Sequence, residues 1–191
     1  MKKLINYILA EGEIVNENIL KVDGFINHQI NPVLMKEIGE EFAKHFKDKG
    51  ITKILTIESS GIAPALMTSL SMDLPLVILK KEPPKELNDN FYQTQVTSYA
   101  TDRSYDLTLC AKYITPDDHV LIIDDFLAHG EAMTGAIRLI RQAHATVGGI
   151  GILIEKSFQP GHTKLREQGL DVYSLARIKS MEPGEITFIE E

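Results

Sequence analysis

The feature that most constrains the fold of this chain is the segment from residue 120 to residue 135, which reads VLIIDDFLAHGEAMTG. Four apolar residues run directly into Asp124 and Asp125, a short turn with Gly130 follows, and a helical pattern opens at Glu131. This order predicts a buried strand that ends in carboxylates and turns into a helix. The N-terminus of a helix exposes backbone N–H groups and therefore suits a phosphate group. The alternative is an ordinary buried strand with an acidic end.

Strands and helices alternate along the rest of the chain. Apolar runs predict strands at residues 53–57, 76–79, 96–99, 107–111, 119–124, 148–155, 171–175 and 186–189, and helical periodicity predicts helices at residues 2–10, 32–50, 61–71, 132–143 and 163–168. This alternation predicts an α/β fold with a twisted parallel sheet, helices on both faces and ligands beyond the carboxyl ends of the strands. Residues 80–95 are polar and contain adjacent prolines, so we expect a mobile, irregular excursion there.

Length and composition narrow the functional classes. A chain of 191 residues is expected to form one domain, and a net charge of −7 offers no basic surface for nucleic acid. The single cysteine, Cys110, excludes an internal disulfide, and the six histidines lack the spacing of metal ligands. We expect Cys110 to be a buried spacer in an apolar run. A reducing cytoplasm fits this cysteine usage, the N-terminal segment lacks a signal-peptide cleavage site, and no apolar run approaches the ~20 residues that span a bilayer.

The segment 120–135 resembles the phosphoribosyl-diphosphate (PRPP) signature of type I phosphoribosyltransferases, in which apolar residues precede two acids and a small loop. Asp124 and Asp125 match the acids that hold the ribose hydroxyls in that family, and the resemblance makes them the catalytic pair. The loop that binds the 5-phosphate is matched by Ala128, His129, Gly130, Glu131 and Ala132. A histidine replaces the usual loop threonine, so backbone N–H groups would make most of the phosphate contacts. The carboxylate of Glu131 would have to point away from the phosphate.

A second turn resembles the pyrophosphate site of the family. Residues 57–64 read IESSGIAP, so Ser59, Ser60 and Gly61 stand between a strand and a helix. Such a turn is a second place for an anion, although either serine could also be a plain N-cap. The resemblance implies a basic residue after the next strand, and we expect Lys81 rather than Lys80 to approach pyrophosphate. A solvated basic pair is the alternative. The loop at about residues 80–110 would then close over the site and exclude water.

Residues 154–161 read IEKSFQPG and place Lys156 directly after an apolar strand. A lysine donates hydrogen bonds and cannot accept them, so this residue would bind the 6-oxo group of a purine and repel the 6-amino group of adenine. Phe158 would either stack on the base or belong to the core. Together with LKVDGFINHQI near the N-terminus, these residues resemble the bacterial branch of the family that acts on xanthine. In that branch Leu20, Asn27 and Lys156 match base-binding positions.

The resemblance implies that xanthine and PRPP react to xanthosine 5'-monophosphate (XMP) and pyrophosphate in purine salvage, with Mg²⁺ held mainly by pyrophosphate oxygens and water. It implies the type I phosphoribosyltransferase fold in one domain over residues 1–191, with a small hood formed by about residues 1–35 and a C-terminal segment. It also implies a homodimer, while cysteine usage, charge and the short apolar runs predict a cytoplasmic protein with no nucleic-acid or membrane partner. Because Ala128 stands where some relatives have an aspartate, no general base is apparent. Two alternatives stay open, a hypoxanthine–guanine or adenine phosphoribosyltransferase and a regulator of the same fold that senses PRPP.

Overall fold

A six-stranded sheet lies at the centre of the computed structural model, which describes residues 1–82, 90–98 and 103–190. The sheet has the order β10-β9-β8-β7-β3-β4. Its strands are β3 (Lys53–Ile57), β4 (Leu76–Leu79), β7 (His119–Leu127), β8 (Thr146–Lys156), β9 (Val172–Glu182) and β10 (Glu185–Phe188). Neighbouring strands are parallel except for β9 and β10, which are antiparallel. The predicted parallel sheet is therefore confirmed, with an antiparallel strand at one edge.

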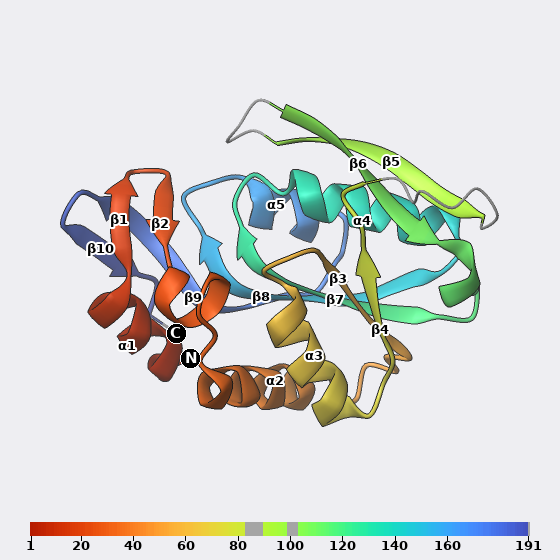
Figure 1. Cartoon of the computed structure of the whole chain (residues 1–191), viewed down its shortest axis with the longest axis horizontal. Coiled ribbons are helices and arrows are strands. Elements are labelled where there is room, and N and C mark those ends of the chain that lie inside the picture. The colour runs from red at the N-terminus through yellow and green to blue at the C-terminus, as the bar shows by residue number, and fades with distance from the viewer. Residues whose placement is uncertain (83–89, 99–102, 191) are drawn as a thin grey trace.

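Helices cover both faces of the sheet. The side chains of β7 point alternately to the two faces and belong to two separate cores. The helices are α1 (Lys2–Glu11), α2 (Pro32–Phe46), α3 (Ile62–Met72), α4 (Glu131–Gln142) and α5 (Gly161–Arg166). Leu121 and Ile123 belong to the core under α2 and α3, whereas Val120 and Ile122 belong to the core under α4 and α5. All four side chains are fully buried. Figure 1 shows α2 and α3 along one face of the sheet and α4 along the other.

The predicted helices form with small shifts of their ends. Asn31 caps α2 by accepting a hydrogen bond from the Leu34 N–H at 3.1 Å, and Pro32 is the first helical residue, as expected. The helix ends at Phe46 instead of continuing to Gly50, whose φ of 67° serves the turn that follows. Within the described part of the chain, no helix has both the length and the apolar character needed to cross a membrane.

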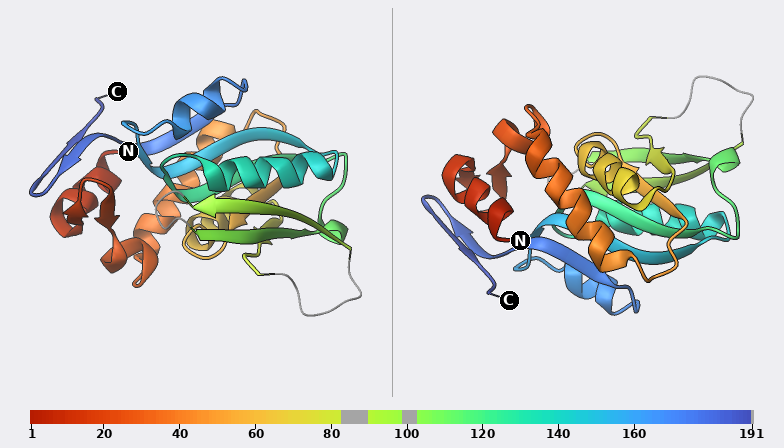
Figure 2. Two further views of the ribbon diagram at one scale, coloured as in Figure 1. Left: turned by 90° about the horizontal axis from the view of Figure 1, so that it is seen from above. Right: turned by 90° about the horizontal axis from the view of Figure 1, so that it is seen from below.

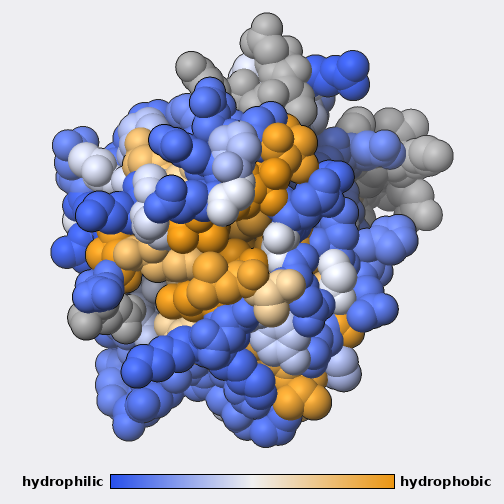
Figure 3. Space-filling view, turned by 90° about the vertical axis from the view of Figure 1, so that its left-hand side faces the viewer, coloured by the Kyte–Doolittle hydropathy of each residue, from blue (hydrophilic) through white to orange (hydrophobic). Residues whose placement is uncertain are grey.

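The N-terminal and C-terminal segments pack together at one end of the sheet and form the hood. It consists of α1, the β1 (Glu13–Asn16) and β2 (Ile19–Lys21) hairpin, the short turn of π-helix η1 (Asp23–Asn27), and the β9–β10 hairpin. Leu4, Leu20 and Ile178 share one buried cluster, which joins segments far apart in the chain. Leu9 and Ile19 remain exposed on the hood, and Figure 3 shows an apolar area framed by hydrophilic residues on this side of the molecule.

A two-stranded hairpin corrects the interpretation of residues 80–95 as irregular. β5 (Phe91–Ser98) pairs antiparallel with β6 (Arg103–Cys110), and the pair lies against α4 rather than inside the main sheet (Figure 2). Residues 83–89 of the expected excursion lie outside the described residues. One isolated bridge, from Lys80 to Thr108, connects β6 with the edge of the sheet. The polar strand β5 lacks a strong apolar alternation, so its pairing with β6 is not visible from local sequence.

Candidate active site

Asp124 and Asp125 lie where β7 has passed the end of its neighbour β3. The pairing of β3 with β7 ends at Ile123, while β7 continues along β8. The two acids therefore border the turn between β3 and α3, and they line a cavity of about 280 Å³ together with Ser59, Ser60, Lys81, Tyr105 and Ala132. The sheet thus brings the predicted acid pair and the predicted pyrophosphate turn to one place.

Burial of the acid pair disfavours two uncompensated negative charges at Asp124 and Asp125. Asp124 is only 8% exposed, and burial raises the pKa of its carboxyl well above the ordinary value, with the charge of Asp125 adding to the shift. Burial also raises the pKa of Asp125. A cation or hydroxyl donors entering the cavity would favour the ionised pair. Oxygen ligands of this kind suit Mg²⁺, provided that phosphate oxygens and water complete its shell.

The turn of Ser59, Ser60 and Gly61 presses directly against Asp124. A Cβ atom on Gly61 would lie 2.3 Å from Thr56 Oγ1 and 2.8 Å from Asp124 Oδ1, so the close approach requires glycine. Helix α3 begins after Gly61, and no side chain of the described residues caps it. The interpretation of this turn as a plain serine N-cap is therefore wrong, and the Ile62 N–H donates instead to the Ser59 backbone carbonyl at 3.1 Å.

Lys80 and Lys81 follow β4, and their side-chain ammonium groups contact different residues. The Lys80 ammonium lies 3.1 Å from the Glu58 carboxylate, and the Lys81 backbone N–H donates to the same carboxylate at 2.7 Å. Burial would raise the pKa of Glu58, but these two hydrogen bonds outweigh it and hold the pKa below the ordinary value. The Lys81 side chain lines the acid-pair cavity, where its ammonium lies 5.5 Å from the centre of the Tyr105 ring. Of the two lysines, Lys81 is the one that faces the acids.

The loop at residues 128–132 joins β7 to α4 and is hydrogen-bonded to residues of α5. Gly130 has a φ of 89°, and no side chain within the described residues caps α4. The Gly161 N–H donates to the Ala128 carbonyl at 3.0 Å, and Lys164 donates to the His129 carbonyl at 3.2 Å. The Glu131 carboxylate lies 3.8 Å from the Lys164 ammonium. It lines a separate groove between β5 and α5, outside the acid-pair cavity.

A second cavity, of about 570 Å³, lies between the loop at residues 128–132 and the hood. Its walls are formed by Asn16, Asn18, Ile19, Ala128, His129, Lys156, Phe158, Gln159 and Pro160. The Lys156 ammonium donates to the Asn18 carbonyl at 2.5 Å and lies 5.4 Å from the centre of the Phe126 ring. Burial lowers the pKa of Lys156, and the charge of Asp125 opposes that shift. Phe158 is 43% exposed, so its interpretation as a core aromatic is wrong.

Two of the predicted base-binding residues do not line this cavity. The Leu20 side chain is buried in the hood cluster, next to Ile19, which does line the cavity. Asn27 is exposed at the end of η1. Sequence reasoning also missed Asn18 and Tyr105, which reach the two cavities from the hood and from β6. Neither had a local signal, because only the tertiary fold brings them to the end of the sheet.

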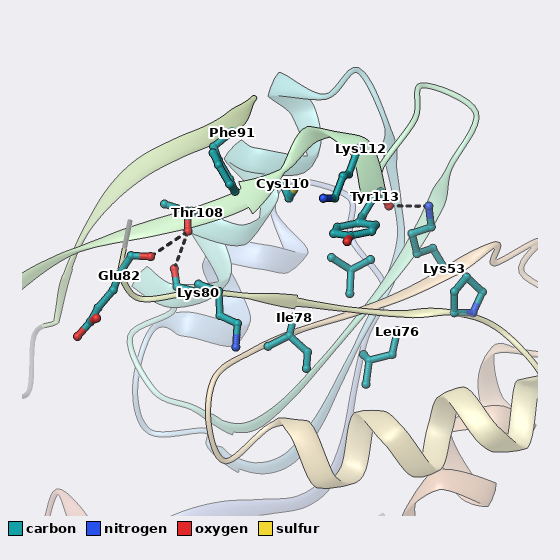
Figure 4. Close-up of a pocket in the computed structure, with 12 residues that line it drawn as sticks. Lys53, Leu76, Ile78, Lys80, Glu82, Phe91, Thr108, Cys110, Lys112 and Tyr113 are labelled. Atoms are coloured by element: carbon teal, nitrogen blue, oxygen red, sulfur yellow. Dashed lines mark hydrogen bonds between the residues drawn. The ribbon is translucent and has the colours of Figure 1, made fainter. Parts of the chain in front are cut away.

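The apolar cavity in Figure 4 lies apart from these residues, along the edge strand β4. Its volume is about 500 Å³, and its walls include Leu76, Ile78, Cys110 and Tyr113. None of the predicted site residues lines it. Lys53 at one end is held by the Tyr113 carbonyl at 2.8 Å. Cys110 is half-buried rather than fully buried, and it lies in this cavity wall.

The parallel sheet, the acid pair at its carboxyl edge and the two uncapped turns before α3 and α4 are the features of a phosphoribosyl transferase domain. The family model of that description matches residues 27–178, and the chain belongs to this family. Proteins named xanthine phosphoribosyltransferase match it over nearly their whole length. The one from Agathobacter rectalis is 65% identical over 191 residues, with both chains fully covered. The one from Clostridium acetobutylicum is 56% identical over 189 residues, covering 99% of this chain and all of the relative.

Solved structures with the same fold include more distant members of the family. The adenine phosphoribosyl transferase from Trypanosoma brucei, in complex with AMP, pyrophosphate and ribose-5-phosphate, aligns with a TM-score of 0.76 and 20% identity. The alignment covers 92% of this chain and 78% of that chain. The adenine phosphoribosyltransferase from Rhodothermus marinus aligns with a TM-score of 0.74 and 21% identity, covering 93% of this chain and 99% of that chain. At these identities the likeness supports the fold alone.

Proposed function

We propose that this protein transfers the phosphoribosyl group of PRPP to xanthine, giving XMP and pyrophosphate in purine salvage. The observation that carries the proposal is the position of Lys156, whose ammonium shares one cavity with Ala128 and His129 of the phosphate loop. A base held there lies next to the sugar phosphate that the loop would bind. The relatives named xanthine phosphoribosyltransferase, at 65% and 56% identity, support the same substrate.

The chain's own residues would position the sugar and favour its positive charge. The loop would hold the 5-phosphate with the backbone N–H groups at the start of α4, and the turn of Ser59, Ser60 and Gly61 would hold pyrophosphate together with Lys81. As the bond from ribose C1 to pyrophosphate breaks and the bond to a base nitrogen forms, the sugar develops oxocarbenium-like charge. Asp124 and Asp125 would hold the ribose hydroxyls and stabilise that charge.

Lys156 would decide which base reacts. Its ammonium donates to a 6-oxo group and has no acceptor for a 6-amino group. Xanthine is the most acidic of the common purines, and a cation at this position favours its anion. An anionic base needs no general base, which agrees with the alanine at position 128. Phe158 would stack on the ring, while Leu20 and Asn27, which do not line this cavity, would act on the base only through the position of the hood.

Three finer features belong to the same proposal. Mg²⁺ would neutralise the pyrophosphate and help it leave, held mainly by pyrophosphate oxygens and water near the acid pair. The protein would act as a cytoplasmic homodimer, as the family resemblance implies. The loop that contains the β5–β6 hairpin would close over the acid-pair cavity, because Tyr105 of β6 already lines it.

Pyrophosphate release tests the proposal directly. Purified protein would be mixed with PRPP, Mg²⁺ and, in turn, xanthine, hypoxanthine, guanine and adenine. We expect xanthine to give the highest kcat/KM and adenine to give no turnover. A preference for hypoxanthine or guanine would move the assignment to the neighbouring branch. No turnover with any base, combined with a gel shift of nucleic acid that depends on PRPP, would establish the regulator instead.

A further inference from the structure

A buried carboxylate lies directly before Lys156 and has no part in the proposed chemistry. The Glu155 side chain is 1% exposed and accepts four hydrogen bonds. Ser157 Oγ and Arg177 Nε donate to one oxygen at 2.5 and 3.2 Å, and Ser174 Oγ and His162 Nδ1 donate to the other at 2.5 and 2.8 Å. Burial would raise the pKa of Glu155, but these donors outweigh it and hold the pKa below the ordinary value. The group is therefore an ionised carboxylate in a defined orientation.

One oxygen of Glu155 holds the base-binding segment. Ser157 stands between Lys156 and Phe158, the two side chains that line the cavity next to the loop. Its hydroxyl binds Glu155, and its backbone N–H donates to the Ile178 carbonyl at 2.9 Å. The hydroxyl contact therefore helps to set the direction in which the chain leaves β8 and presents Lys156.

The other oxygen reaches the phosphate loop through the start of α5. His162 follows Gly161, and because a carboxylate only accepts, Nδ1 of His162 carries the proton in their contact. A Cβ atom on Gly161 would lie 2.4 Å from the Ala128 carbonyl and 3.1 Å from the Gly130 nitrogen. The backbone at residue 161 is thus in direct contact with the loop. A displacement of His162 would therefore shift the backbone at Gly130.

We propose that Glu155 is a positioning residue that anchors both substrate sites, with Ser157 as its arm to the base and His162 as its arm to the 5-phosphate loop. This inference rests on the proposed function. It predicts that the two arms act separately. Loss of a hydrogen bond to a buried charge corresponds to about a tenfold change in an equilibrium constant.

Four variants separate the arms. Ser157→Ala is expected to raise the KM for xanthine about tenfold and leave the Kd for PRPP·Mg²⁺, measured by calorimetry without base, within about twofold. His162→Ala is expected to do the reverse, and His162→Asn, whose amide can donate to the same oxygen, to restore most of the PRPP affinity. Glu155→Gln is expected to weaken both substrates. His45→Ala is the matched control, because His45 faces the carboxylate of Asp171 at 3.3 Å, where β9 begins.

The outcomes distinguish this inference from the proposed function. If Ser157→Ala and His162→Ala change both constants by the same factor, or if Glu155→Gln changes neither, the role of Glu155 as a shared anchor with two separate contacts is overturned. If wild-type protein shows no turnover of xanthine, the proposed function itself fails. Should Glu155→Gln not fold, the opposite effects of the two single-arm variants still decide the matter.

Discussion

The Lys156 ammonium donates a hydrogen bond to the backbone carbonyl of Asn18 at 2.5 Å. The contact connects the carboxyl end of β8 with the hood, and both residues line the same cavity. A purine 6-oxo group is an acceptor of the same kind as this carbonyl, so a bound base can replace Asn18 as the partner of the lysine. The donor that would select the base thus lies at the wall of the cavity.

Replacing Lys156 should therefore impair base selection far more than PRPP binding. We expect Lys156→Met to lower kcat/KM for xanthine by about 10- to 100-fold, the loss expected for a charged hydrogen bond. The Kd for PRPP·Mg²⁺ should change less than about twofold. Lys179→Met, on an exposed position of β9, serves as the control. Equal losses of base turnover and PRPP affinity would contradict the role given to Lys156.

A methyl group on Gly61 should damage the acid pair. Because its Cβ would lie 2.8 Å from Asp124 Oδ1 and 2.3 Å from Thr56 Oγ1, Gly61→Ala must displace the turn or the carboxylate. We expect a loss of about 1–3 kcal/mol in the free energy of unfolding and at least about a tenfold fall in kcat. Urea denaturation and pyrophosphate release measure the two effects. Gly24→Ala, whose nearest neighbour would be at 3.5 Å, should change neither, and full activity of Gly61→Ala would refute the close-contact argument.

Asp118 should contribute stability that disappears in acid. It lies 2.7 Å from the Lys53 ammonium and accepts from the Thr115 N–H at 2.7 Å. Burial would raise the pKa of Asp118, but these contacts outweigh it and lower the pKa. The stabilisation is therefore fully present above the unfolded-state pKa of about 3.9 and is lost as the pH falls through the lower folded-state pKa.

Asp118→Asn tests that dependence. At pH 7 we expect the free energy of unfolding to fall by about 1–3 kcal/mol, and the difference from wild type to shrink as the pH falls below about 4. Denaturant titrations at pH 7, 5 and 3.5 measure it. Asp48→Asn removes an exposed carboxylate 3.9 Å from Lys47 and should have little effect. A destabilisation that stays the same at every pH would show that the ion pair is not its source.

Much of the fold and the centre of the site follow from local sequence, because apolar runs and helix caps are local signals. Lys53–Ile57 and Leu76–Leu79 form strands with the predicted ends, and Asn31 caps its helix. Acids at the end of a buried strand, and small residues between a strand and a helix, are both expected at the carboxyl edge of a parallel sheet. Their positions could therefore be predicted from the sequence. The sheet then brings Asp124, the serine turn and Ala132 at the start of α4 to one cavity.

What the sequence did not reveal depends on contacts between distant segments. The strand β5 is polar, so its local sequence pattern resembles that of a loop. It forms a strand because it pairs with β6 and packs against α4. Asn18 meets Lys156 across 138 positions of sequence. Glu155 looks like an ordinary polar residue at a strand end, and its four donors come from three different segments. Such networks require the fold before they can be recognised.

The acid pair should show opposite effects on stability and activity. Because burial raises the pKa of Asp124, its ionised form destabilises the folded protein, and the destabilisation grows as the pH rises from the unfolded-state value of about 3.9 through the folded-state pKa. Asp124→Asn removes that ionisation, so it should be more stable than wild type at pH 8, with the difference closing toward pH 4. Its kcat/KM should fall by about 100-fold or more, since the ribose hydroxyls and the developing charge lose their carboxylate. Thermal melts at the two pH values and pyrophosphate release at pH 8 decide the point. Lower stability at pH 8, or retained turnover, would show that Asp124 is a structural acid.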